Sequence, residues 1–282
     1  MAASKPAKKG GSRPDLATLG GLVLAVGGIM LGMLMEGGKV KDVAQVSAAV
    51  IVFGGTIGAV MVTTPMNVLF RATKRLWAVL FEHARPKQAI LDDILDYATQ
   101  ARKQGIVSLE QRASEVHDPF LRKALNLAVD GIEMSQIRSI MELEITLVEQ
   151  DGEAEAKVFE SAGGYAPTIG IIGAVLGLMQ VMKHLADIDE VGRGIAGAFV
   201  ATVYGVGSAN LFFLPAASKL RARVRETLNV RELMLEGVLS IVEGLNPKLI
   251  RTKLDAYLEP QAAAKKAAEK PKAAPQPVSA EG

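Results

Sequence analysis

Four stretches of the chain carry no charged side chain over the roughly twenty residues that a helix needs to cross a bilayer. They are Leu16–Met35, Val43–Thr64, Ser161–Met182 and Gly194–Ser218. Uncharged runs of this length predict four transmembrane helices. The third begins with the motif "GGYAPTIGIIGAVLGLMQVM", which places a proline about one turn inside a span rich in glycine.

The polar segments between and after these stretches follow a helical period. Ile90, Ile94, Tyr97 and Ala101 fall on one face of a helix. Gly105 and the pair Asp130-Gly131 are typical of helix ends, and Asp118-Pro119 is typical of a helix start. Leu220, Val224 and Leu228 keep a four-residue stripe after the fourth span, and Pro247 ends that helix. The pattern predicts an all-α integral membrane protein.

The predicted organisation has six parts. In order, they are a basic N-terminus (1–15), spans one and two (16–65), a helical domain (66–160), spans three and four (161–218), C-terminal helices (219–258) and a disordered tail rich in Ala, Lys and Pro (259–282). Basic residues gather before span one, after span two and after span four. By the positive-inside bias, both termini and the middle domain are cytoplasmic.

Composition excludes several function classes. Net charge is +2 over 282 residues, and no basic stripe with interleaved aromatics occurs, so no nucleic-acid partner is expected. Cys is absent, which removes disulfides and thiolate chemistry. The three His residues are too scattered for a metal site. Phosphate-binding loops and nucleophile motifs are missing, so we expect neither an enzyme nor a bound cofactor.

Small residues recur at four-residue spacing in every span. Gly28–Gly32, Gly54–Gly58 and Gly173–Gly177 are G-x-x-x-G pairs, and Gly197, Ala201 and Gly205 repeat the spacing. Such faces let helix backbones approach closely in lipid. The motifs fit packing within one bundle, and their presence in all four spans also indicates oligomerisation.

Two prolines and two hydroxyls are the unusual groups in spans three and four. Pro167 sits near the predicted start of span three, where its missing N–H leaves no bond unmade. Pro215 lies late in span four and is expected to kink it. Each is either a simple bend or a hinge beside an ion path. Thr202 and Tyr204 are the best polar groups available, yet neither can titrate near neutral pH.

A charged pair in the middle domain flanks the Gly105 turn. Arg102 is expected at a helix C-terminus and Glu110 at a helix N-terminus, where each complements the helix dipole. That structural role and a binding role are both open for the two residues.

The chain resembles the MotA/PomA family of bacterial flagellar stator subunits. The resemblance runs from span one to Leu258 and rests on "ARKQGIVSLE", "DPFLRKALNLAVDG", the span-three motif and "GIAGAFVATVYGVGSANLFFLPAASKL". It implies a homo-oligomer, five copies around two copies of a single-span MotB-type partner in the inner membrane. In that family the titrating aspartate belongs to the partner, which accounts for the absence of charge in these four spans.

The resemblance also implies roles for individual positions. Pro167 and Pro215 match prolines tied to torque generation, and Thr202 matches a threonine facing the ion path. Arg102 and Glu110 match the charged pair that engages the rotor protein FliG. Sodium-driven relatives carry a threonine where this chain has Ala174, which supplies no oxygen ligand, so the expected coupling ion is the proton.

Two other interpretations remain open from the sequence. An ExbB/TolQ-type energiser of outer-membrane processes forms a similar ring, but that group has three spans with an outside N-terminus rather than four with an inside one. A membrane scaffold without ion flux is the other alternative, which the prolines and Thr202 disfavour.

Overall fold

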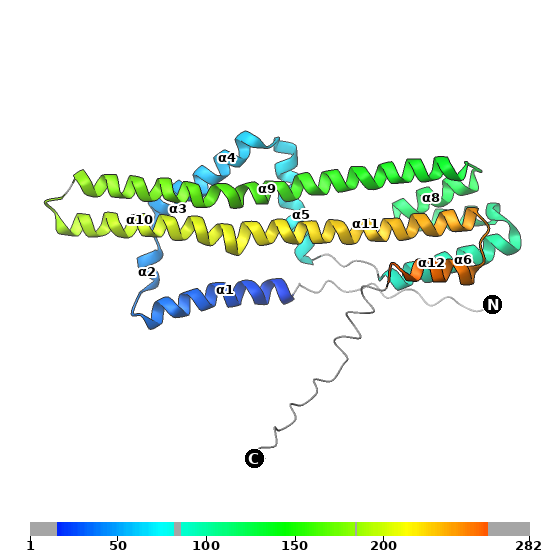
Figure 1. The fold of residues 1–282 in the computed structure, drawn as a ribbon, viewed down its shortest axis with the longest axis horizontal. Helices are drawn as coiled ribbons and strands as arrows, with labels where there is room; N and C mark the ends of the chain where they lie inside the picture. Colours follow the sequence, from blue (N-terminus) through cyan, green and yellow to red (C-terminus); the bar gives the residue numbers. More distant parts are fainter. Residues whose placement is uncertain (1–15, 82–85, 184, 259–282) are drawn as a thin grey trace, which may run out of the picture. The chain divides into compact units, whose positions relative to one another are not determined.

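The computed structural model describes residues 16–81, 86–183 and 185–258, and it is helical throughout with no strand in these ranges (Figure 1). The helices before α9 are α1 (Leu16–Met35), α2 (Val40–Val43), α3 (Val46–Ala49), the π turn η1 (Val50–Gly54), α4 (Gly55–Thr63), α5 (Met66–Phe81), α6 (Lys87–Gln104), the 3₁₀ turn η2 (Ile106–Leu109), α7 (Glu110–Glu115) and α8 (Pro119–Val129). Then follow α9 (Met134–Lys183), α10 (Ile188–Ser208), the π turn η3 (Ala209–Phe213), α11 (Leu214–Val242) and α12 (Pro247–Asp255).

The predicted all-α membrane architecture is confirmed. Four helices within the described ranges are long and apolar enough to cross a bilayer: Thr18–Met35, Val46–Thr63, and one window each within Met134–Lys183 and Ile188–Val242. The predicted N-terminus and tail lie outside the described residues. The third and fourth spans are not separate helices, because each continues without a break into the polar helix beside it.

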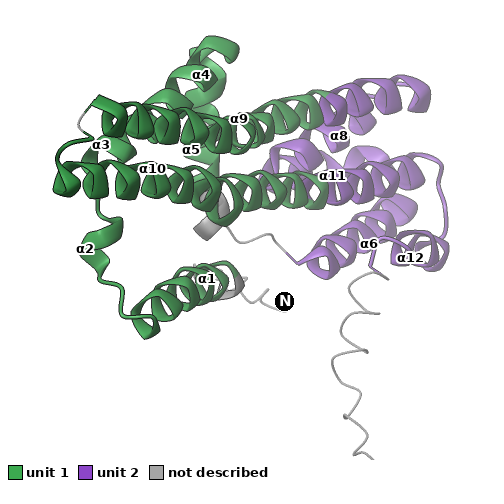
Figure 2. Ribbon diagram, turned by 60° about the vertical axis from the view of Figure 1, so that its left-hand side comes forward, with its two compact units in different colours: residues 1–84, 147–226 green, residues 85–146, 227–282 purple. Residues whose placement is uncertain are grey.

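The chain divides into two compact units, and α9 and α11 each run through both (Figure 2). Unit 1 holds residues 1–84 and 147–226, and unit 2 holds residues 85–146 and 227–282. In unit 1, the antiparallel helices α9 and α10 lie side by side and are covered by α3 and η1 through Ala48, Val52, Val200 and Ala201. A second cluster, centred on Phe159, Ala217 and Leu220, joins α4, α5, α9 and α11.

Unit 2 has its own apolar core. Ile90, Leu91 and Ile94 from α6 are at most 1% exposed. They belong to a buried set that also includes Leu109, Phe120, Leu121, Leu125, Ile137, Met141, Leu233 and Met234. Asp118 accepts hydrogen bonds from the backbone of Phe120 and Leu121 at 2.9 and 3.0 Å and so starts α8, with Pro119 as its first residue.

Ion pairs hold the helices of unit 2 together around that core. Glu236 of α11 accepts from Arg138 of α9 at 2.8 Å and from Lys253 of α12 at 2.7 Å. Burial of Glu236 raises the pKa of its carboxyl, but the hydrogen bonds from Lys253 and Arg138 outweigh that effect and leave the pKa below its usual value. The Glu236 carboxylate therefore ties three helices together in its charged form.

The two prolines occupy different helical environments. The expectation that the missing N–H of Pro167 leaves no bond unmade is wrong: α9 begins at Met134, before span three, so Pro167 lies in the helix interior. The carbonyl of Gly163, four residues earlier, therefore has no N–H donor from Pro167. Pro215 lies just after the π turn η3, where the helix is more loosely wound than an α-helix. Because proline has no N–H, it removes one backbone hydrogen bond to this same part of the helix.

Candidate functional site

Helices α9 and α10 contact each other backbone to backbone through small residues. A Cβ placed on Gly205 would lie 2.5 Å from the Ala166 carbonyl oxygen and 3.0 Å from the Gly170 Cα. A Cβ on Gly170 would lie 2.9 Å from the Ala201 carbonyl oxygen, and further along the pair Gly177 meets Ala198 in the same way. We call this line of contacts the glycine seam. It leaves no room for side chains at Gly205 or Gly170.

Three of the predicted site residues lie beside the glycine seam. Pro167 follows the seam residue Ala166, Ala174 follows Gly173, and Thr202 follows Ala201. Each residue is rotated by about 100° around the helix axis from the residue before it. In two antiparallel helices that face each other, the residue after a seam position therefore lies on the same side of the pair in both helices. Pro167, Ala174 and Thr202 therefore share one side of the pair. Because Ala201 contacts both Gly170 and Gly173, Thr202 lies at a level between the other two.

The side that carries these three residues is free of other helices among the described residues. Helices α3 and η1 cover the opposite side, where they pack on Val200 and Tyr204, the residues that precede the seam positions Ala201 and Gly205. Around Pro167, Ala174 and Thr202 the exposed neighbours are apolar. They are Ile171, Leu178, Phe199 and Val206, between 46% and 70% exposed. We call this surface the Pro167 face.

Thr202 is the polar group among the three residues that define the Pro167 face. Its hydroxyl donates to the Ala198 carbonyl at 3.2 Å, which leaves the oxygen lone pairs directed away from that bond as acceptors. Spans three and four contribute no titratable carboxylate or imidazole to the face. The face can accept a hydrogen bond and provide a smooth apolar wall, but it cannot take up a proton near neutral pH.

Tyr204 and Pro215 do not join this group. The Tyr204 hydroxyl donates to the Val43 carbonyl and accepts from the Gln45 backbone N–H at 3.3 Å, and its ring lies 6.0 Å from that of Phe53. These contacts tie α10 to the start of span two. Pro215 lies ten residues beyond Gly205, about 15 Å along the helix. It lines a cavity of about 620 Å³ between α1, α5 and the region around η3.

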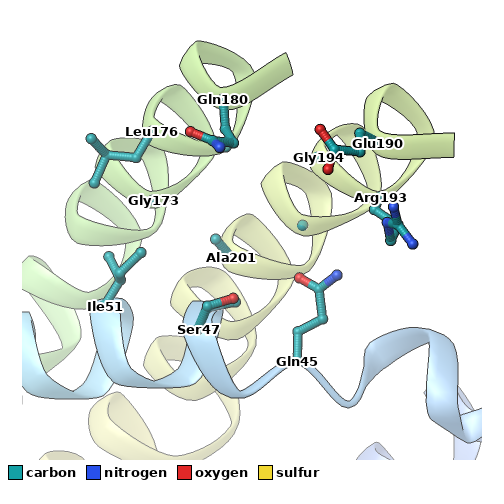
Figure 3. Close-up of a pocket in the computed structure, with 13 residues that line it drawn as sticks. Gln45, Ser47, Ile51, Gly173, Leu176, Gln180, Glu190, Arg193, Gly194 and Ala201 are labelled. Atoms are coloured by element: carbon teal, nitrogen blue, oxygen red, sulfur yellow. The ribbon is translucent and has the colours of Figure 1, made fainter. Parts of the chain in front are cut away.

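A cavity of about 440 Å³ with several polar residues in its lining lies on the opposite side of the pair, between α3, η1, α9 and α10 (Figure 3). Gln45, Ser47, Gln180, Glu190 and Arg193 line it near the turn that joins α9 to α10, and Gly173 and Ala201 lie at its inner part. Sequence reasoning missed this cavity. Its signal is the set of polar residues at the ends of three spans, beside glycines at 173, 177, 194 and 197 that let the surrounding helices approach closely.

The predicted charged pair flanks the Gly105 turn in unit 2. Arg102 is in the last turn of α6 and Glu110 is the first residue of α7, as predicted. Gly105 has a φ of 82°, a left-handed conformation that glycine adopts without strain. Both charged side chains are exposed, and neither forms an ion pair with another described residue. Arg102 also lines a cavity of about 350 Å³.

Comparison with known proteins decides the family. Residues 19–105 match the family "Motility protein A N-terminal", and residues 112–233 match the "MotA/TolQ/ExbB proton channel family". Motility protein A of Bacillus subtilis is 37% identical over 86% of this chain and 91% of its own length. The chain belongs to the motility protein A family. Chemotaxis protein PomA of Vibrio alginolyticus is 34% identical over 86% of this chain and 95% of its own length.

Solved structures of the family have the same fold. The flagellar MotAB stator complex from Bacillus subtilis includes a chain that is 36% identical, with a TM-score of 0.82 over 90% of this chain and 100% of that one. The C. jejuni MotAB structure gives a TM-score of 0.83 at 31% identity, over 86% of this chain and 95% of that one.

Family membership confirms the main functional prediction. The chain is a multi-pass membrane protein and an ion-channel subunit of a flagellar stator rather than an enzyme. The ExbB/TolQ-type alternative is disfavoured, because the N-terminal match is specific to motility proteins and the named relatives at 34–37% identity are motility or chemotaxis proteins.

Proposed function

We propose that the Pro167 face is the wall of an ion path whose other wall is the single transmembrane helix of a MotB-type partner. The observation that carries this proposal is the juxtaposition of Pro167, Ala174 and Thr202 on one uncovered, apolar side of the glycine seam. A smooth apolar wall with one hydroxyl suits a helix that moves past it, because no strong polar contact fixes a single position.

Proton uptake and release belong to the partner in this mechanism. A carboxylate on the partner helix, facing Thr202, takes a proton from one side of the membrane and releases it to the other. Each elementary charge that crosses 100 mV releases about 2.3 kcal/mol, enough to bias a small change in helix packing. The proton is the coupling ion, because Ala174 adds no oxygen that could replace water around sodium.

The stator in this proposal is a ring of five copies around two partner helices in the inner membrane. Both termini and unit 2 are cytoplasmic by the distribution of basic residues. The paired glycines of spans one and two support close contacts beyond the single chain. A Cβ added at Gly28, Gly32, Gly54 or Gly58 would meet no atom within 4 Å, so these glycines are not used for packing within the chain.

Arg102 and Glu110 are assigned to the rotor protein FliG. Their exposure and their lack of ion-pair partners among the described residues support a role in binding another molecule. Arg102→Glu or Glu110→Lys is expected to lower torque while the stator still assembles. Lys123→Glu is a matched control, because it reverses an exposed charge whose partner is Glu144 within the chain. Loss of assembly in the Arg102 variant would make its role structural.

The test of the whole proposal is swimming in a strain that lacks this gene alone. Cells should keep their flagellar filaments but be paralysed, and the wild-type gene should restore swimming. Pro167→Leu should not restore it, although the protein is present in the membrane at normal level. Gly164→Ala is the control on the same helix, because a Cβ at Gly164 meets no atom within 4 Å. Normal swimming with Pro167→Leu would refute the role of this face.

A further inference from the structure

Three helices end around one hollow in unit 2. The hollow is the cavity of about 350 Å³ lined by Ala98, Ala101, Arg102, Ile106, Ala128, Gly131, Ile132, Ile241, Val242, Gly244 and Leu245. α8 ends before Gly131, α11 ends before Gly244, and α6 ends at Gln104, next to the lining residue Ile106. The ends of the three helices leave this cavity open between them.

The glycines at these ends keep the hollow open. Gly131 and Gly244 have φ values of 74° and 73°, and each ends its helix in a Schellman motif. The Ile132 N–H donates to the Leu127 carbonyl at 3.1 Å, and the Leu245 N–H donates to the Ser240 carbonyl at 3.1 Å. A Cβ on either glycine would meet no atom within 4 Å. The carbonyls at these two ends are thus partly satisfied without a side chain that fills the space.

The side chains that line the hollow are apolar except at one point. Ala98, Ala128 and Ile241 are buried and form the floor, and the half-buried side chains Ile106, Ile132, Val242 and Leu245 form the walls. Arg102 is the one charged residue among those that line the hollow. Its guanidinium is exposed and forms no ion pair with another described residue. A ligand that matches this surface has an apolar group next to an anion.

We infer that this hollow is a socket for an apolar side chain of the rotor protein, seated beside the carboxylate that Arg102 contacts. The inference rests on the proposed rotor contact and adds a second element to it. An exposed ion pair alone contributes little to binding, whereas an apolar side chain buried in a pocket with a charged rim is the usual form of an interface hot spot. The apolar socket contributes most of the binding free energy, and the charge of Arg102 contributes specificity for a partner with a carboxylate at that position.

The chain suits a direct test of occupancy because it contains no Cys. Ala101→Cys places the only thiol at the wall of the socket, and Thr99→Cys places it on the exposed face of the same helix, outside the lining. The full stator is labelled with N-ethylmaleimide in cells with and without the rotor protein. The socket predicts that the rotor protein slows labelling at position 101 by about tenfold, as expected for a site covered by an interface anchor. Labelling at position 99, which lies one turn from Arg102 but outside the lining, should slow by much less.

A second variant tests function with the charges intact. Ala101→Phe fills the socket without altering Arg102 or Glu110, and Thr99→Phe adds the same ring outside it. We expect about a tenfold loss of rotor binding in Ala101→Phe and a much smaller loss of rotor binding in Thr99→Phe, whose ring lies outside the socket. Both proteins must reach the membrane at equal levels.

The outcomes separate the socket from the rotor contact itself. If Arg102→Glu lowers torque but Ala101→Phe behaves like Thr99→Phe, the socket is wrong and the charged contact stands. If Arg102→Glu has no effect either, the proposed rotor contact is wrong as well. Equal labelling at position 101 with and without the rotor protein refutes the socket, including the case in which a small amphipathic anion fills it in both strains.

Discussion

The glycine seam makes a quantitative prediction at Gly205. In Gly205→Ala the new Cβ would lie 2.5 Å from the Ala166 carbonyl oxygen, 3.0 Å from the Gly170 Cα and 3.2 Å from the Pro167 Cα. All three are backbone atoms, so no side-chain rotation relieves the overlap. The helices must separate by about 1 Å at this level to restore an ordinary van der Waals distance.

The expected cost follows from this forced separation of two helix backbones. Overpacking a close-packed site destabilises by about 1–3 kcal/mol. In lipid no hydrophobic effect holds the two helices together, so the weaker packing between them is not offset. The intrinsic helix preference of Ala over Gly, about 1 kcal/mol, acts in the opposite direction and reduces the net effect. The helices are displaced next to Pro167, in the proposed ion path. We therefore expect a larger proportional decrease in swimming speed than in the stability of the stator.

Matched controls isolate the seam from the change in helix propensity. Gly207→Ala lies two residues further along the same continuous helix, where a Cβ meets no atom within 4 Å. Gly170→Ala places its Cβ 2.9 Å from the Ala201 carbonyl oxygen and should have an intermediate effect. The measurements are the melting temperature of the purified stator and the swimming speed of complemented cells. Equal values for Gly205→Ala and Gly207→Ala would refute the argument.

Three further predictions concern single contacts. Tyr204→Phe removes the hydroxyl that bonds Val43 and Gln45, and we expect a decrease of about 1 kcal/mol in the free energy of unfolding; an unchanged melting temperature would contradict it. Ala174→Thr adds an oxygen beside Thr202, and sodium should then accelerate rotation; wild-type swimming should not depend on sodium, and a sodium requirement would overturn the choice of proton. The lowered pKa of Glu236 means that its stabilisation is present above the unfolded pKa, near 4.5, and is lost as pH falls through the folded pKa. In Lys253→Met the decline in melting temperature should begin at a higher pH, because burial then raises the Glu236 pKa with one fewer hydrogen bond to oppose it.

The ends of several elements were predictable because they depend on local chemistry. Gly105 ends α6 because its backbone is left-handed there, and Asp118 starts α8 because its carboxylate accepts from the two following free N–H groups. The extent of α9 was not predictable in this way. α9 runs without interruption from a polar segment that begins at Met134 into the apolar third span. The two segments differ only in their surroundings, water for one and lipid for the other, and this difference does not interrupt the helical backbone. For that reason the start of the third span was wrongly taken as the start of a helix, and the missing N–H of Pro167 as one that leaves no bond unmade.

Four membrane crossings and the lack of charged residues within them follow from the amino-acid sequence alone, because charge and hydropathy are properties of each segment. The family follows from it too, through motifs spread along the chain. Which candidate residues act together depends instead on how the helices pack. Pro167, Ala174 and Thr202 share a side because α9 and α10 are antiparallel and meet along the glycine seam, whereas Tyr204 points to the opposite side. A four-residue spacing of glycines shows that a helix has a small face, but the register between two helices depends on the contacts that both of them make.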